Sequence, residues 1–138
     1  MSVVEVVITC VETTGARVRL SDCVAFDQDI TTMSVELLAD DVKARRGVEL
    51  LLDHDGLARF FERLADDFLG WDDERTWRTY DEEFAVTARF HSRGRVELRW
   101  SLADHASHAW SANVTTWIHA GEDMRSLAGR LRELLDAR

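Results

Sequence analysis

Alternating apolar and polar positions dominate the first fifty residues and predict four β-strands. The first segment is almost continuously apolar, and in the other three apolar side chains recur largely at every second position, the spacing that gathers them on one face of a strand. The four segments are 3–11, 17–26, 33–39 and 42–52. The turns between them are short, so neighbouring strands should pair antiparallel, because a parallel pair needs a long crossover connection.

The spacing then changes to that of a helix. Apolar residues follow one another at intervals of three and four, which places them on one stripe of a helical surface. The stripe consists of Leu57, Phe60, Phe61, Leu64 and Phe68. Asp53 or Asp55 can cap the start of this helix, and Gly70 can end it in the left-handed conformation.

Strand-like alternation resumes after this helix. It covers segments 84–90, 96–102 and 110–118, with Trp77 at the start of a further short strand, and a last helical stripe spans 124–135. The order is four strands, a helix, three or four strands and a helix. We therefore expect an α+β fold in a single domain over residues 1–138, with a predominantly antiparallel sheet of about seven to eight strands. The two helices should cover one face of that sheet.

Composition supports a globular chain and narrows its setting. Hydrophobic residues make up 46% of the sequence and charged residues 31%, which suits neither a disordered chain nor a membrane protein. No apolar run approaches the roughly 20 residues that span a bilayer. The first residues, MSVVEVVITC, lack the basic start of a signal peptide. We expect a cytoplasmic protein without a membrane partner, and reduced thiols at Cys10 and Cys23.

The charge argues against a nucleic-acid partner. The net charge is −9, whereas binding to DNA or RNA rests on cationic contacts to phosphate. Residues 53–83 alone hold eleven acidic residues and four arginines. Such an acidic region either keeps the surface solvated or attracts a basic protein partner.

The most unusual stretch, GWDDERTWRTYDEE at 70–83, lies within this acidic region. On a structural interpretation Trp71 covers the end of the helix, the next residues form a polar turn, and Trp77 begins a strand. On a functional interpretation the stretch is a binding surface, because tryptophan, tyrosine and arginine dominate interface hot spots. The candidate partner-binding residues are then Asp66, Asp67, Trp71, Asp72, Asp73, Glu74, Arg75 and Trp77.

A family resemblance rests on three motifs. The phenylalanine-rich helix running into GWDDERTW, the strand sequence VELRWSL and the leucine-rich last helix resemble the actinobacterial domain of unknown function 6228 family. The family pattern has a glycine soon after the first tryptophan, where this chain has Asp73. Sixteen arginines against the single Lys43 agree with a GC-rich source. The family has no established activity, so the resemblance implies a fold and a source but no chemistry.

Signals for catalysis or metal binding are weak. The chain has no G-x-S-x-G, P-loop, dinucleotide or H-E-x-x-H motif. His105 and His108 are spaced as zinc ligands can be, but a structural site needs four ligands. Asp22 and Arg46 interrupt apolar strand faces and could pair with each other. We expect no metal and no cofactor, and an enzyme is not indicated.

Two functions remain open on these observations. The leading hypothesis is a non-enzymatic protein-interaction module, for example one of the immunity type, that binds a basic protein or associates with itself. The alternative is a small-molecule-binding protein that uses a pocket between the sheet and the helices. Its candidate ligand-binding residues are Arg99 and Trp117, which fall on the polar face of two neighbouring strands. Trp100 and Trp110 fall on apolar faces and should be buried.

Overall fold

The computed structural model describes residues 4–10 and 15–138, and it contains eight strands and two α-helices. In chain order these are β1 (Glu5–Thr9), β2 (Arg17–Ala25), β3 (Ile30–Ala39), β4 (Val42–Leu51), α1 (Gly56–Asp66), β5 (Glu74–Arg78), β6 (Phe84–Phe90), β7 (Arg95–Ala103), β8 (Ser111–His119) and α2 (Glu122–Asp136). The predicted α+β class is confirmed. The turn expected before Gly15 lies largely outside the described residues. Among those residues, no helix combines the length and the apolar character that crossing a membrane requires.

The strands form two four-stranded antiparallel sheets, where the hydrophobic pattern predicted one sheet. The first has the order β1-β2-β3-β4 and the second β5-β6-β7-β8, so within each sheet consecutive strands pair with each other. Alternation shows which residues share a face, but it does not show what covers that face. Here a second sheet covers it.

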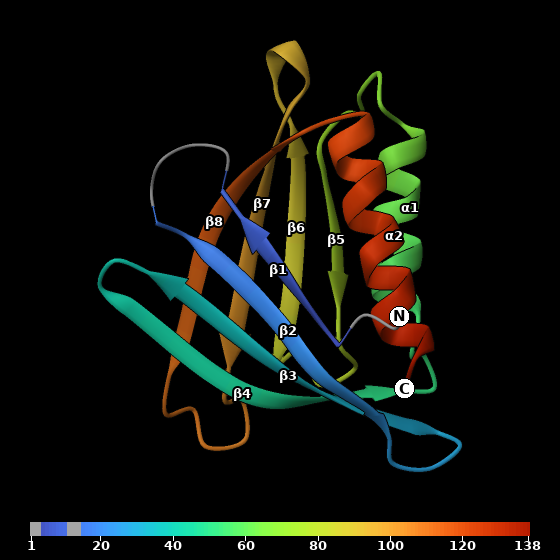
Figure 1. Cartoon of the computed structure of the whole chain (residues 1–138). Coiled ribbons are helices and arrows are strands. Elements are labelled where there is room, and N and C mark those ends of the chain that lie inside the picture. Colours follow the sequence, from blue (N-terminus) through green and yellow to red (C-terminus); the bar gives the residue numbers. More distant parts are fainter. Residues whose placement is uncertain (1–3, 11–14) are drawn as a thin grey trace.

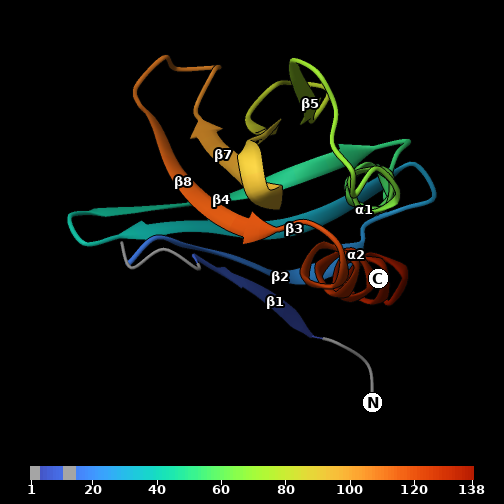
Figure 2. The same ribbon diagram turned by 90° about the horizontal axis from the view of Figure 1, so that it is seen from above.

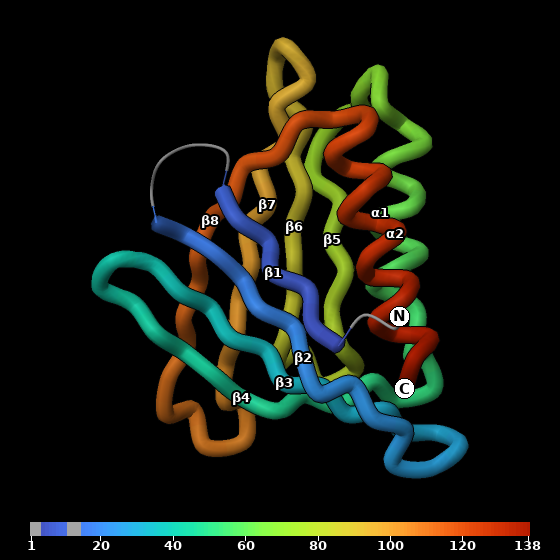
Figure 3. The backbone as a smooth tube through the Cα atoms, viewed as in Figure 1, coloured from blue at the N-terminus to red at the C-terminus, as the bar shows by residue number. Residues whose placement is uncertain are grey.

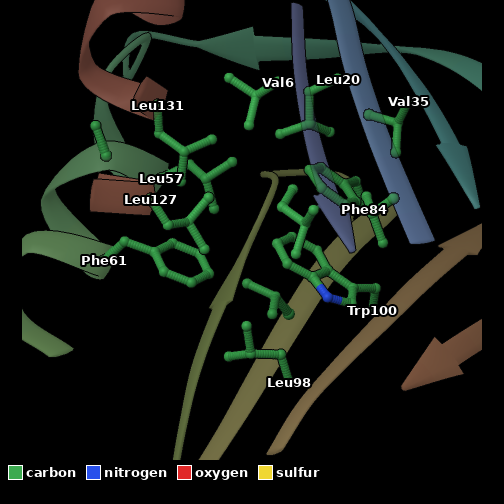
Figure 4. Close-up of a cluster of buried hydrophobic side chains, with 14 of the residues drawn as sticks. Val6, Leu20, Val35, Leu57, Phe61, Phe84, Leu98, Trp100, Leu127 and Leu131 are labelled. Atoms are coloured by element: carbon green, nitrogen blue, oxygen red, sulfur yellow. The ribbon is translucent and has the colours of Figure 1, made fainter. Parts of the chain in front are cut away.

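The two sheets pack face to face, and their strands run in clearly different directions (Figures 1 and 2). The tube in Figure 3 follows the chain through the first sheet, α1, the second sheet and α2 in turn. The inner faces of both sheets and the apolar sides of both helices share one hydrophobic core. Trp100 of β7 lies in this core and stacks on Phe61 of α1 and Phe84 of β6, with ring centroids 5.7 and 6.1 Å away (Figure 4).

The helices lie side by side at one side of the sheets (Figure 1). They are antiparallel, because Arg125 near the start of α2 pairs with Asp66 at the end of α1, whereas Arg132 further along α2 reaches back to Asp55. The Asp55 side chain does not cap α1 as the sequence suggested. Its carboxylate instead binds Arg132, with Nη1 at 2.9 Å.

Helix α1 is shorter than its apolar stripe predicted. It ends at Asp66, and Phe68 beyond it is 53% exposed instead of buried. The Gly70 amide donates to the carbonyl of Asp67, so the chain has already turned away from the helix axis at this point. The apolar stripe continues to Phe68 in the sequence, but the spacing of apolar residues does not show where the helix ends.

The suggested pairing of Asp22 with Arg46 is wrong. Asp22 lies at a bulge in β2, has a φ of 55° and is exposed. Arg46 lies on the inner face of β4 and binds Glu83, with Nη2 2.9 Å from Oε1. Its Nη1 donates to the carbonyl of Ala103 at 3.2 Å. Arg46 therefore ties the first sheet to the loops at one end of the second.

Candidate functional site

The connection from α1 to β5 contains most of the predicted partner-binding residues, and its two tryptophans have structural roles. The half-buried Trp71 meets Phe90 edge to face, with centroids 5.2 Å apart, and its Nε1 donates to the carbonyl of Ala88 at 3.3 Å. Trp77 of β5 packs in the same manner on Phe84, at 5.7 Å. Both rings anchor the connection to β6, whereas the structural interpretation had placed Trp71 against the end of the helix.

Arg75 also makes its contacts within the fold. Its guanidinium carbon lies 4.9 Å from the centre of a Trp71 ring, and its Nη1 lies 2.6 Å from Oδ2 of Asp67. It therefore closes the connection by joining the end of the helix to the first residues of β5. This ion pair is accessible to solvent at both ends, so it contributes little stability by itself.

The remaining predicted residues form an exposed surface that also contains two apolar side chains. Asp66, Asp67, Asp72, Asp73 and Glu74 are exposed, and between them Phe68 is 53% and Leu69 87% exposed. We call Asp66, Asp67, Phe68, Leu69, Asp72, Asp73 and Glu74 the acidic corner. The hydrophobic pattern did not indicate that Phe68 and Leu69 lie on the surface. The sequence did contain one indication of this exposure: Leu69 is apolar, lies off the helical stripe and directly precedes Gly70.

Not all carboxylates of the acidic corner are neutralised within the chain. Asp67 pairs with Arg75, Asp66 with Arg125 at 3.5 Å, and Glu74 with Arg89 at 3.8 Å. Within the described part of the chain, Asp72 and Asp73 form no ion pair. These two adjacent carboxylates are therefore the free negative charges of the surface.

An open groove of about 490 Å³ borders the acidic corner between α1 and β5. It is lined by Phe60, Arg63, Leu64, Asp67, Arg75 and Thr76. Asp67 thus belongs to both features. A side chain of a bound protein could enter this groove while its neighbours contact the exposed Phe68 and Leu69.

Arg99 and Trp117 share the outer face of the second sheet, as their alternation predicted. Glu97, however, lies directly opposite Trp117, and Arg99 lies opposite Thr115. The Trp117 ring is already covered by Arg95, whose guanidinium carbon lies 4.3 Å from the ring centre, and by the ring of His91 at 5.0 Å. These two residues cannot line a pocket between sheet and helices, since their side chains point away from the core.

A small hollow of about 120 Å³ lies beside Arg99 on this face. Its lining consists of Glu74, Thr87, Arg89, Glu97 and Arg99. Arg99 is exposed and forms no ion pair among the described residues. A small anion could therefore meet its guanidinium without displacing a carboxylate.

The histidine-containing loop between β7 and β8 forms no metal site in the described part of the chain. No group of three or more histidine, cysteine, aspartate or glutamate side chains converges there or elsewhere in that part. Hydrogen bonds from Ser107, followed by the charge of Arg46, lower the pKa of the Asp104 carboxyl. Trp110, which the pattern placed in the core, is 37% exposed because β8 begins only at Ser111.

Comparison with known proteins places the chain in a family. The model of a family of unknown function, DUF6228, matches residues 9–138. The chain belongs to this family. A search of curated proteins finds no match.

Among solved structures, the fold resembles that described as "Structure of the plant transcriptional regulator PBF-2". The TM-score is 0.52 at 7% sequence identity, and the match covers 96% of this chain and 80% of the other. At this identity the likeness concerns the fold alone. Membership of DUF6228 agrees with the resemblance seen in the sequence motifs.

Proposed function

We propose that this DUF6228 member is a non-enzymatic protein-binding module, of the immunity type, whose acidic corner docks on a basic surface of another protein. The observation that carries the proposal is the pair of exposed apolar side chains, Phe68 and Leu69, set among five carboxylates. Large exposed apolar side chains with a polar rim are the usual composition of a protein contact. The unpaired Asp72 and Asp73 supply the attraction for a cationic partner.

The fixed geometry of the connection supports the same proposal. Trp71 is held by Phe90 and by the carbonyl of Ala88, and Arg75 joins the connection to the helix. A surface that is already ordered loses little conformational entropy when it binds. In this proposal the tryptophans act as positioning residues for the acidic corner, and the carboxylates and Phe68 and Leu69 make the contacts.

We place this module in a bacterial cytoplasm and treat residues 1–138 as one domain. Both cysteines are free, which suits a reducing compartment. One hydrophobic cluster joins both sheets and both helices, which supports a single folding unit. The excess of arginine over lysine supports a GC-rich, actinobacterial source.

The test compares what the purified protein retains from its own host with what two charge variants retain. Asp72→Lys with Asp73→Asn removes the unpaired carboxylates, and asparagine tolerates the φ of 59° at position 73. The control, Glu133→Lys with Asp22→Asn, makes the same charge change away from the corner, with position 22 at a similar φ of 55°. Native mass spectrometry then measures any polypeptide retained at fixed stoichiometry.

We expect the wild type and the control to retain the same polypeptide and the corner variant to lose it. A photoreactive residue in place of the 87% exposed Leu69 should cross-link to that polypeptide. Equal retention by the corner variant, or no polypeptide retained at fixed stoichiometry, would contradict the proposal.

A second candidate function is the binding of a small anionic molecule at Arg99. The hollow beside Arg99 and its unpaired guanidinium favour it. Trp117 is less suited to stack on a ligand, because Arg95 and His91 already cover it. A thermal-shift screen of anionic metabolites should then find stabilisers whose effect disappears in Arg99→Ala, and finding none would argue against this function.

A further inference from the structure

Strand β4 forms a long outer edge of the first sheet. It spans ten residues and lies at the end of the order β1-β2-β3-β4, so only β3 pairs with it. Among the described residues, no backbone hydrogen bond joins β4 to any segment on its other side. In Figure 2 strands of the second sheet lie on that side of β4 and cross it, and β7 contacts it, but none of them is paired with it. Half of its backbone N–H and C=O groups thus point away from β3, where another strand could pair with them.

The other three outer strands are shorter than β4 or have no charged residues that could fix how a second strand aligns with them. Strand β1 has five residues, and Arg130 of α2 donates to its Val7 carbonyl at 3.4 Å. Strand β5 also has five residues and contacts α1. Strand β8 has nine residues but carries no lysine, arginine, aspartate or glutamate that could select a register.

We propose that two copies of this chain associate through β4, paired antiparallel about a two-fold axis at Gly47. In a two-fold antiparallel pair, a residue before the axis lies opposite the residue equally far after it in the other copy. With the axis at Gly47, Arg45 of each copy lies opposite Glu49 of the other. The two first sheets would then form one continuous eight-stranded sheet.

The charges of β4 select this axis over its neighbours. An axis at Arg45, Arg46 or Glu49 places that residue opposite its own copy, and an axis at Ala44 places Lys43 opposite Arg45. Like charges directly opposite are destabilising, whereas opposite charges contribute roughly 0.2–1 kcal/mol per pair. An axis at Val48 creates neither kind of pair within the strand. Among axes from Ala44 to Glu49, only the Gly47 axis gives two attractive pairs and no repulsive one.

The single chain leaves these charges free, whereas the Gly47 carbonyl at the axis accepts a hydrogen bond from Nε of Arg46 at 3.3 Å, which the pairing would have to replace. Within the described residues, Lys43, Arg45 and Glu49 are exposed and form no ion pair; the Nε of Arg45 donates only to Ser34 Oγ, at 3.3 Å. Nothing lies within 4 Å of the point where a Cβ of Gly47 would be. No side chain therefore stands on the outer face of the sheet at the axis.

Exposed apolar side chains at the strand ends fit the same pairing. The Gly47 axis places Val42, which is 39% exposed, opposite Leu52, which follows the strand and is 76% exposed. It also lays the aliphatic stem of Lys43 against Leu51, which is 38% exposed. The association would cover apolar surface that the single chain leaves in water, and it involves a different surface from the acidic corner.

A charge swap tests the register directly. Sedimentation velocity over a range of concentrations should show a wild-type dimer. Arg45→Glu and Glu49→Arg should each weaken it by about tenfold or more, because two attractive pairs become two repulsive ones. The double variant restores opposite charges, and its dissociation constant should return to within about threefold of the wild type. Arg17→Glu, on the outer face of β2 with the same charge change, should leave the dimer unchanged.

Circular dichroism verifies that each variant is folded, and Arg45→Gln and Glu49→Gln replace any charge reversal that fails to fold. A protein that is monomeric at all concentrations overturns the proposal. A dimer that survives both single reversals, or one that the swap does not restore, also overturns it, because the contact would then lie elsewhere.

Discussion

The indole Nε1 of Trp100 donates a hydrogen bond of 3.0 Å to Oγ1 of Thr116, and both residues are completely buried. This bond joins β7 to β8 inside an otherwise apolar core. It also fixes the plane of the Trp100 ring, on which Phe61 and Phe84 stack. A single polar contact therefore orients the aromatic centre shared by α1 and the second sheet.

Replacing Thr116 by valine should lower the free energy of unfolding by about 1–3 kcal/mol, because the buried indole N–H loses its acceptor. Thr116→Ser keeps the hydroxyl and removes one methyl group, which costs about 1 kcal/mol. Urea denaturation of both variants measures the difference. If the valine variant is as stable as the wild type or more stable, the hydrogen bond makes no net contribution to the free energy of unfolding.

Arg132 joins the two helices, and removing it should change how stability depends on pH. Its Nη2 lies 2.8 Å from Glu62 and its Nη1 2.9 Å from Asp55, and these hydrogen bonds lower the pKa of both carboxyls. Carboxyls with a lowered pKa add stability above their ordinary pKa, and this stability is lost as the pH falls through the lowered pKa. Arg132→Met should therefore be less stable than the wild type by about 1 kcal/mol near neutral pH.

The difference between the two proteins should shrink in acid. Urea denaturation at about pH 7 and about pH 3 measures it. Arg78→Met, which removes an exposed pair with Glu82, provides a control with little effect at either pH. A stability difference that does not change with pH would mean that Arg132 acts through packing alone.

Trp71 and Asp72 should separate the structural from the binding role of the GWDDERTW stretch. Trp71→Ala removes a half-buried ring from Phe90 and should lower the free energy of unfolding by about 2–3 kcal/mol. Asp72→Lys changes an exposed side chain without an ion pair and should change it by less than about 0.5 kcal/mol. Thermal denaturation compares them, and similar losses in both variants would refute this division.

Cys23 should react slowly with alkylating reagents. Burial raises the pKa of its thiol, although Arg138 opposes the shift, so little reactive thiolate forms near neutral pH. Mass-spectrometric peptide mapping after iodoacetamide treatment should show faster modification in urea than in buffer. Equal rates in both conditions would mean that the fold does not protect this thiol.

The strands and helices could be predicted from the sequence, but the way in which they assemble could not. Alternation identified Val96, Leu98, Trp100 and Leu102 as one buried strand face, because burial imposes a period of two on any strand. It could not show that the strands divide into two sheets, since each sheet covers the other with residues distant in sequence. The misassigned partner of Arg46 has the same cause, as Glu83 lies in the loop between β5 and β6, at one end of the other sheet.

The candidate site was partly visible in the sequence. Its carboxylates were recognised because they are dense, and Trp71 and Trp77 because they are rare residue types. Phe68 was assigned to the core because it continues the stripe of Leu57, Phe61 and Leu64. Its exposure depends on where the helix stops, which the turn at Gly70 decides.

Because each sheet consists of four consecutive strands, the first sheet is synthesised completely before the second. The first four strands leave the ribosome and can form their hydrogen bonds before the second sheet exists. Until β5–β8 follow, the inner face around Leu20 and Val35 has nothing to cover it, although both residues are fully buried in the finished protein. A nascent chain at this stage would present both an apolar face and an unpaired edge. The half-made molecule is therefore the one most in need of a chaperone.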